Sequence, residues 1–116
     1  LGFEQGIQID NTIFVSGQAA LDPDGNVVGI GDMRLQAEYT FQNIATVLAT
    51  AGGSLNDVVK ITAWLTDMAD YGAYNEVRKI AFSERKPASS TVLSPQLVLP
   101  ELRIEIEAIA VLHTAK

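Results

Sequence analysis

Residues 103–111 constrain the fold most, because their apolar side chains alternate with other residues. A β-strand turns residues i and i+2 to the same face, so this alternation predicts a strand. A carboxylate is costly to desolvate unless it is hydrogen-bonded or paired, so the acidic face must be solvated or line a cleft that needs an acid. The apolar face would carry Ile104, Ile106, Ala108 and Ala110, and the other face Glu105 and Glu107.

The composition excludes several kinds of site. With 116 residues the chain can bury one core without a disulfide or a structural metal. It contains no cysteine, which excludes a thiolate nucleophile and a Cys-based zinc site and is compatible with the cytoplasmic location that we expect. The single histidine, His113, leaves almost no material for His-based catalysis or a metal site, and we expect it to face solvent. We expect neither a metal nor a cofactor.

The charge argues against nucleic acid as a partner. The formal net charge is −6, and the basic residues are scattered, whereas nonspecific binding to nucleic acid needs lysines and arginines gathered opposite phosphates. Residues 78–86 form the one local basic patch, which we interpret as a solvated helix end. No apolar run approaches the length of a membrane span and no signal peptide is visible, so no membrane partner is expected.

Turn and helix signals divide the first half of the chain. Residues 7–9 and 12–16 predict a hairpin that turns at Asp10-Asn11, and residues 21–31 predict a loop. Asp32 can cap a long helix, for which apolar residues recur at helical spacing up to residue 51, and Gly52-Gly53 can end it.

The second half alternates strands and a helix. Residues 58–66 predict a strand that turns Val59, Ile61, Ala63 and Leu65 to the core. A second helix is predicted over about 70–84, ended by Pro87, and residues 90–93 predict a short strand before a loop over 94–101.

This order, β-β-α-β-α-β-β, predicts one α+β domain over residues 1–116, a sandwich with both helices on one face of a single sheet. The other sheet face is too apolar for plain solvent and too polar for a monomer core, so we expect it to meet another subunit. We interpret Trp64 as interface packing rather than a substrate platform, and Glu107 as a structural residue paired with Lys60. This face would display Thr62, Trp64, Glu105, Glu107, Ile109 and Val111.

Segments spread over nearly the whole chain resemble the reactive intermediate deaminase family (RidA/YjgF), sometimes labelled L-PSP endoribonuclease. The resemblance implies a chorismate-mutase-like fold and a homotrimer with three clefts between subunits. In such clefts, characterised members hydrolyse enamines or imines such as 2-aminoacrylate to a 2-keto acid and ammonia without a cofactor. The matching segments are residues 13–18 (IFVSGQ), Asn43 followed by Gly52-Gly53, and residues 58–62 (VVKIT), 74–76 (YNE), 87–91 (PASST) and 104–110 (IEIEAIA).

The resemblance also implies roles for single residues. Glu105 matches a glutamate thought to position or activate water; the alternative is an interface carboxylate held by hydrogen bonds. Asn75 matches a ligand-contacting asparagine, although its poor helix propensity alone suggests a tertiary hydrogen bond. By the same resemblance, Ser16 and Gly17 match a pair that contacts the ligand, although the sequence alone would make Ser16 a turn residue. Phe3 and Thr91 would set the size of the pocket, and they stand where a tyrosine and a cysteine are common in the family.

Position 89 departs from the family pattern. Deaminating members have Pro-Ala-Arg where this chain has Pro87-Ala88-Ser89, and that arginine grips the substrate carboxylate. A hydroxyl offers one donor and no charge, so we expect 2-aminoacrylate and other small 2-imino acids to be poor substrates. If such substrates are turned over, Arg78 or Arg103 must supply the charge.

Three classes of function are compatible with the sequence. The first is a cofactor-free hydrolase of an enamine, imine or related C–N substrate, with Glu105 as base and the pocket residues named above. The second is a non-catalytic small-ligand-binding or stress-related interaction protein that keeps the cleft without the chemistry. The third is a ribonuclease, which the acidic charge and the shortage of histidine disfavour.

Overall fold

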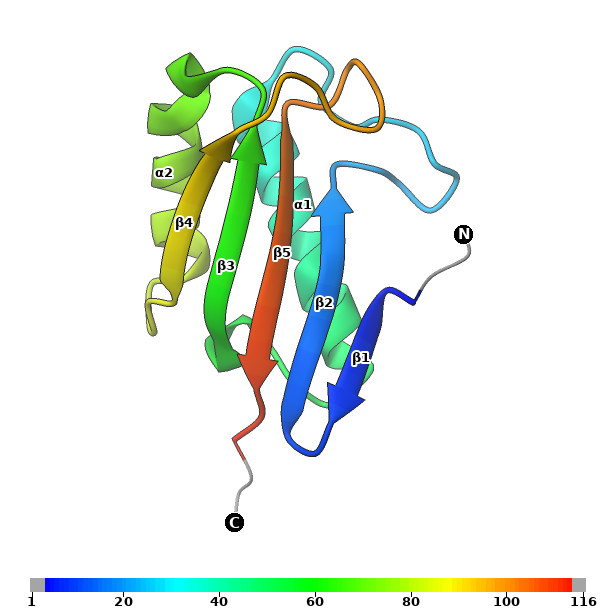
Figure 1. Cartoon of the computed structure of the whole chain (residues 1–116), viewed down its shortest axis with the longest axis vertical. Helices are drawn as coiled ribbons and strands as arrows, with labels where there is room; N and C mark the ends of the chain where they lie inside the picture. The colour runs from blue at the N-terminus through cyan, green and yellow to red at the C-terminus, as the bar shows by residue number, and fades with distance from the viewer. Residues whose placement is uncertain (1–3, 114–116) are drawn as a thin grey trace.

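A computed structural model describes residues 4–113 as a five-stranded sheet with two helices on one face. Figure 1 shows α1 and α2 behind the sheet, while the face toward the viewer carries no helix. This arrangement confirms the predicted α+β architecture. The elements are β1 (Gly6–Ile9), β2 (Thr12–Ala19), α1 (Met33–Ala49), β3 (Val58–Leu65), α2 (Tyr71–Ala81), β4 (Ala88–Leu93) and β5 (Ile104–Val111), with 3-10 turns η1 (Leu55–Asp57) and η2 (Met68–Asp70).

The sheet has the strand order β1-β2-β5-β3-β4. β5 lies at its centre and pairs antiparallel with both β2 and β3. β3 and β4 run parallel, because α2 crosses over between them, and their register places Ile61 beside Ser89. The last strand of the chain therefore lies between segments from both halves of the sequence.

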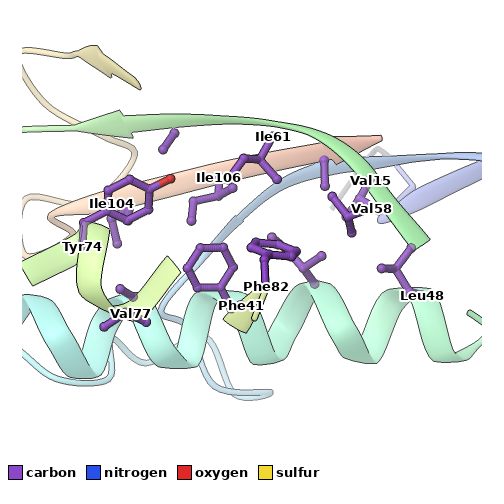
Figure 2. Packing of buried hydrophobic residues seen from close by; sticks show 14 of the residues in the cluster. Val15, Phe41, Leu48, Val58, Ile61, Tyr74, Val77, Phe82, Ile104 and Ile106 are labelled. Carbon is purple, nitrogen blue, oxygen red and sulfur yellow. The ribbon is translucent and has the colours of Figure 1, made fainter. Parts of the chain in front are cut away.

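The core lies between the sheet and the helices. Ile104 and Ile106 are fully buried on the covered face of β5, as the alternation in the sequence predicts. Figure 2 shows Phe41 of α1 and Phe82 in this layer, and their rings meet edge to face with centroids 5.3 Å apart. Leu48 closes the far end of the same layer. The apolar side chains that recur every second residue in the strands thus pack against those that recur every 3.6 residues in the helices.

Helix α1 begins and ends where the sequence predicts. The Asp32 carboxylate accepts a hydrogen bond from the Leu35 backbone N–H, and Gly52 supplies the left-handed residue after the helix with φ 81°. The second helix differs from its prediction, because α2 ends at Ala81 rather than Glu84. Phe82 leaves helical geometry and is buried in the core, so the helix stops well before Pro87.

Two strands also differ in detail from their predictions. β2 continues to Ala19, past the predicted end at Ser16. β3 contains a register irregularity between Val58 and Lys60, so Val58 is buried and Val59 is 42% exposed. The prediction that Val59 faces the core was wrong, because a bulge changes which face a residue occupies and periodicity alone does not reveal it.

The sheet face without helices, called the open face, carries Phe14, Thr62, Trp64, Glu105, Glu107, Ile109 and Val111. Phe14 is 44% exposed and Val111 is 40% exposed on it. No helix in the part of the chain that the structure describes is long and apolar enough to cross a membrane.

Candidate functional site

Glu105 lies on the open face of β5 and packs against Gly17 of β2. A Cβ atom added to Gly17 would lie 2.9 Å from Glu105 Cδ and closer still to its Oε2. A side chain at position 17 would therefore displace the carboxylate. The glycine predicted as a ligand contact thus makes room for the predicted catalytic acid.

The surroundings of Glu105 favour its protonated form. Burial, and then the nearby Glu107 carboxylate, raise the pKa of Glu105 above that of an ordinary glutamate. Neither cause is a hydrogen bond, so residues 4–113 give no support to the alternative that hydrogen bonds within the chain hold this carboxylate. A carboxylate with a raised pKa is suited to general acid and base chemistry.

Ser16 and Gly17 lie where the pairing of β2 with β5 changes register, between Val15 and Gln18. The Ser16 hydroxyl donates to the Glu4 carbonyl at 2.6 Å, and the Ser16 N–H donates to the Gln5 carbonyl at 2.9 Å. Ser16 therefore holds the segment before β1 against β2. Gly17 is exposed beside it.

Asn75, Ser89 and Thr91 lie at the other edge of the molecule, on α2 and β4. Ser89 pairs with Ile61, and Thr91 with Ala63, so both lie on the covered face of the edge strand. The Asn75 side-chain oxygen accepts a hydrogen bond from Arg78, one turn along the same helix. The predicted tertiary hydrogen bond of Asn75 is therefore wrong, because its partner is local.

One chain does not bring these two groups together. Glu105 and Gly17 lie on the open face, whereas Ser89 and Thr91 lie on the opposite face of the sheet, with β3 between β4 and β5. Phe3 lies outside the described residues. A site that uses both groups needs parts of two chains.

One further prediction about a pair of side chains is corrected by the structure. Lys60 stands opposite Ile109 and donates to the Ser90 hydroxyl at 2.7 Å, while Glu107 stands opposite Thr62, so the predicted Lys60–Glu107 pair is wrong. A shift of two residues along the strands separates the two charges.

His113 is exposed, as predicted, but it is not free of contacts. Its Nδ1 lies 2.5 Å from the Asp57 carboxylate, and its ring also contacts Arg85. His113 therefore joins the end of the chain to η1.

Near Ser89, Tyr74 was not predicted as a site residue, and Arg78 was named only as one of two arginines that could supply the charge missing at position 89. Arg78 donates to the Ser89 hydroxyl at 3.3 Å, and its guanidinium lies 5.8 Å from the centre of the Tyr74 ring. The spacing carried the available signal, because position 78 lies four residues after 74 and three after 75, so Arg78 shares a helix face with each of them.

The hollows of the single chain lie elsewhere. One groove of about 520 Å³ runs between β1 and α1, lined in part by Gln8 and Val47, and another of about 540 Å³ is lined by Asp67 and Arg103. Arg103 is held there by both oxygens of the Asp70 carboxylate, at 2.9 and 3.0 Å. Within residues 4–113, no three His, Asp or Glu side chains gather closely enough to hold a metal ion.

Comparison with known proteins gives a consistent family. A family model described as Endoribonuclease L-PSP matches residues 1–112. A RutC family protein from Pyrococcus abyssi is 42% identical over 108 residues, covering 93% of this chain and 84% of the relative. A mouse protein named 2-iminobutanoate/2-iminopropanoate deaminase is 38% identical over 109 residues, covering 94% of this chain and 80% of the relative.

A solved structure agrees with these relatives. The crystal structure of Escherichia coli TdcF with bound serine superimposes with a TM-score of 0.87 at 33% identity, covering 96% of this chain and 88% of that one. The share of this chain that is covered agrees with the family model and with both sequence relatives. The chain belongs to the RidA/YjgF (Endoribonuclease L-PSP) family.

Proposed function

We propose that this protein is a cofactor-free hydrolase of imine or enamine C–N bonds, with Glu105 as its base. The observation that carries the proposal is the Glu105 carboxylate, which packs against Gly17 on the open face with a raised pKa. The mouse relative named 2-iminobutanoate/2-iminopropanoate deaminase supports this reaction class. The proposed substrate is a small imine or enamine that enters from the open face.

The site is proposed to lie between subunits of a homotrimer. Trp64 and the exposed Phe14 and Val111 give the open face an apolar surface that a second copy would cover. A neighbouring chain would bring its β4 edge, with Ser89 and Thr91, toward the Glu105 of the first chain. The number three comes from the family resemblance, and the apolar open face supports assembly.

The proposed reaction uses one carboxylate twice. Ionised Glu105 takes a proton from water as the oxygen attacks the imine carbon, and returns that proton to the nitrogen to give a carbinolamine. Glu105 then takes the hydroxyl proton of the carbinolamine and passes it to the nitrogen. The C–N bond breaks, ammonia leaves, a carbonyl forms, and Glu105 is again a carboxylate.

The way in which this protein binds the carboxylate of a substrate is proposed to differ from that of its deaminating relatives. Ser89 offers a hydroxyl where those members have an arginine, so 2-aminoacrylate is proposed to be a poorer substrate here. Turnover of 2-aminoacrylate should be measured beside an arginine-containing family member under the same conditions. Equal turnover would refute this part of the proposal.

The role of Glu105 is tested with 2-iminobutanoate generated in situ from threonine by a dehydratase, at a protein concentration high enough to measure the slow turnover expected without an arginine at position 89. The variant Glu105→Gln preserves shape and removes the base, so the enzyme-catalysed release of ammonia, measured above the spontaneous rate, should fall by about 10²- to 10⁴-fold. Glu107→Gln is the matched change two residues along β5. It should keep the plateau rate within a few-fold and move the acid limb of the pH profile to lower pH, because Glu107 raises the pKa of Glu105.

The same variants separate the hydrolase from its main alternative. If Glu105→Gln keeps full turnover while its assembly is intact, Glu105 is structural. A non-catalytic ligand-binding cleft would then be the better account of the open face. Size-exclusion chromatography of both variants shows whether assembly is intact.

A further inference from the structure

Arg78 carries a cation without an acidic partner. Arg34 pairs with Glu76 and Arg103 pairs with Asp70, but no carboxylate of residues 4–113 lies within ion-pair distance of Arg78. Its guanidinium instead contacts the Ser89 hydroxyl, the Asn75 side-chain oxygen and the face of the Tyr74 ring. These neutral contacts fix the guanidinium and leave its charge uncompensated.

A second observation at the same place is the hydroxyl of Tyr74. The residue is 0% exposed, yet its hydroxyl has no hydrogen-bond partner in the described part of the chain. Figure 2 shows the ring rising from α2 with the oxygen turned toward the strands. Burial raises the pKa of Tyr74, and Ser89 and Arg78 are close enough to oppose that shift. The hydroxyl is therefore a buried group beside a cation that pairs with no carboxylate of residues 4–113.

A buried donor without an acceptor is unfavourable, and native proteins rarely keep one without a reason. Three donor groups converge here: the phenol of Tyr74, the hydroxyl of Ser89 and the guanidinium of Arg78. An anionic acceptor among these three groups would give the phenol a partner and compensate the charge of the guanidinium. A planar guanidinium fork matches the two oxygens of a carboxylate.

We propose that Tyr74, Arg78 and Ser89 form a carboxylate-binding subsite in which Arg78, anchored on α2 by Asn75, holds the carboxylate of the substrate. The subsite is the end of the proposed inter-subunit cleft contributed by α2 and β4, so its place in catalysis rests on the proposed function. Ser89 is small enough to leave room for a guanidinium that arrives from the helix instead of from the strand. Asn75 is a positioning residue, because it acts on the ligand through Arg78.

This subsite makes the substrate a small 2-imino or 2-enamino carboxylate. The carboxylate is held from the helix side, so the substrate is not oriented as it would be by an arginine on β4. Weak turnover of 2-aminoacrylate and retained affinity for a carboxylate are therefore compatible.

The test is direct binding of pyruvate, the 2-oxo acid counterpart of such a substrate, to the assembled protein by isothermal titration calorimetry. Arg78→Gln should weaken pyruvate binding by about tenfold or more, because the charge-assisted fork is lost. Lys79→Gln, the same change at the neighbouring exposed residue of α2, should leave the affinity unchanged. Arg78→Lys keeps the charge without the fork and should bind with intermediate affinity.

Tyr74→Phe removes only the hydroxyl and should weaken pyruvate binding by about three- to tenfold. Unchanged affinity in this variant would remove Tyr74 from the subsite. Pyruvamide has the shape of pyruvate without its charge and should bind at least about tenfold more weakly than pyruvate. Inorganic phosphate that displaces pyruvate and binds more tightly would overturn the carboxylate assignment in favour of a phosphate site.

The two proposals fail in distinguishable ways. Wild-type affinity in Arg78→Gln, or no pyruvate binding by the wild type at millimolar concentration, overturns the subsite. Glu105→Gln should keep pyruvate affinity within a few-fold, since binding needs no base. If Glu105→Gln keeps turnover while pyruvate binding depends on Arg78, the hydrolase proposal fails and the subsite stands.

Discussion

The two faces of strand β5 differ in a way that separates folding from chemistry. On the covered face Ile104 and Ile106 are fully buried against α1 and α2. On the open face Glu105 and Glu107 stand beside Ile109, and no helix of residues 4–113 covers them. Residues that alternate along one strand thus have entirely different surroundings.

The covered face is fully packed within one chain, whereas the open face leaves apolar side chains exposed. A covered face with fully buried isoleucines needs no second copy to be stable. An open face with exposed aromatic and aliphatic side chains around a carboxylate of raised pKa is suited to an interface that also carries a reaction. The candidate site is therefore expected to depend on assembly, and the fold of the protomer is not.

The largest expected effect is on the free energy of unfolding, and it is measured by truncating one isoleucine on each face of β5. Ile106→Ala leaves a cavity in the core and should lower the free energy of unfolding by about 2–5 kcal/mol at any protein concentration. Ile109→Ala makes the same chemical change on the open face, where the side chain is only partly buried. Its effect should be smaller and should grow with protein concentration, because it acts through assembly.

Urea denaturation at two protein concentrations measures both effects. If both variants lose the same free energy of unfolding at both protein concentrations, the open face is packed within one chain as fully as the covered face. The contrast between the faces would then be wrong.

A positive charge introduced on the open face should have the next largest effect, which is on assembly. Trp64→Lys would place an ammonium group in the proposed interface and should weaken assembly by about tenfold to hundredfold, or about 1.4–2.7 kcal/mol. Gln42→Lys adds the same charge at an exposed position of α1 and is the control. Sedimentation equilibrium checks the prediction, and a wild type that is monomeric at micromolar concentration would contradict it.

The fold could be predicted from the sequence where one periodicity dominates. Strict alternation placed β5, and Asp32 with Gly52 bounded α1, because these signals are local. The exposed Val59 and the early end of α2 could not be predicted, since a bulge and the burial of Phe82 depend on tertiary packing.

The site was predictable only in part, for the same reason. The family pattern named Glu105, Gly17 and Ser89, but the contact of Arg78 with Ser89 becomes visible only when β4 is placed beside α2. The unpartnered hydroxyl of Tyr74 is also a property of three-dimensional packing. From the sequence, Arg78 is one of two candidate sources of charge and Tyr74 belongs only to a segment that resembles the family, so neither contact could be predicted.

The smallest expected effect concerns pH and Glu105. Because burial and Glu107 raise the pKa of Glu105, the native state binds this proton more tightly than the unfolded chain does. Its stabilising contribution is therefore fully present below the ordinary glutamate pKa, about 4.3, and is lost as pH rises through the raised value. Glu105→Gln does not titrate, so its melting temperature should exceed that of the wild type at pH 7, and the difference should shrink toward pH 4. Glu38→Gln, at an exposed position of α1, should show no such pH-dependent difference. A Glu105→Gln difference that stays constant from pH 4 to 7 would mean that ionised Glu105 is as well accommodated on the open face as in water, and its value as a base near neutral pH would then need another source.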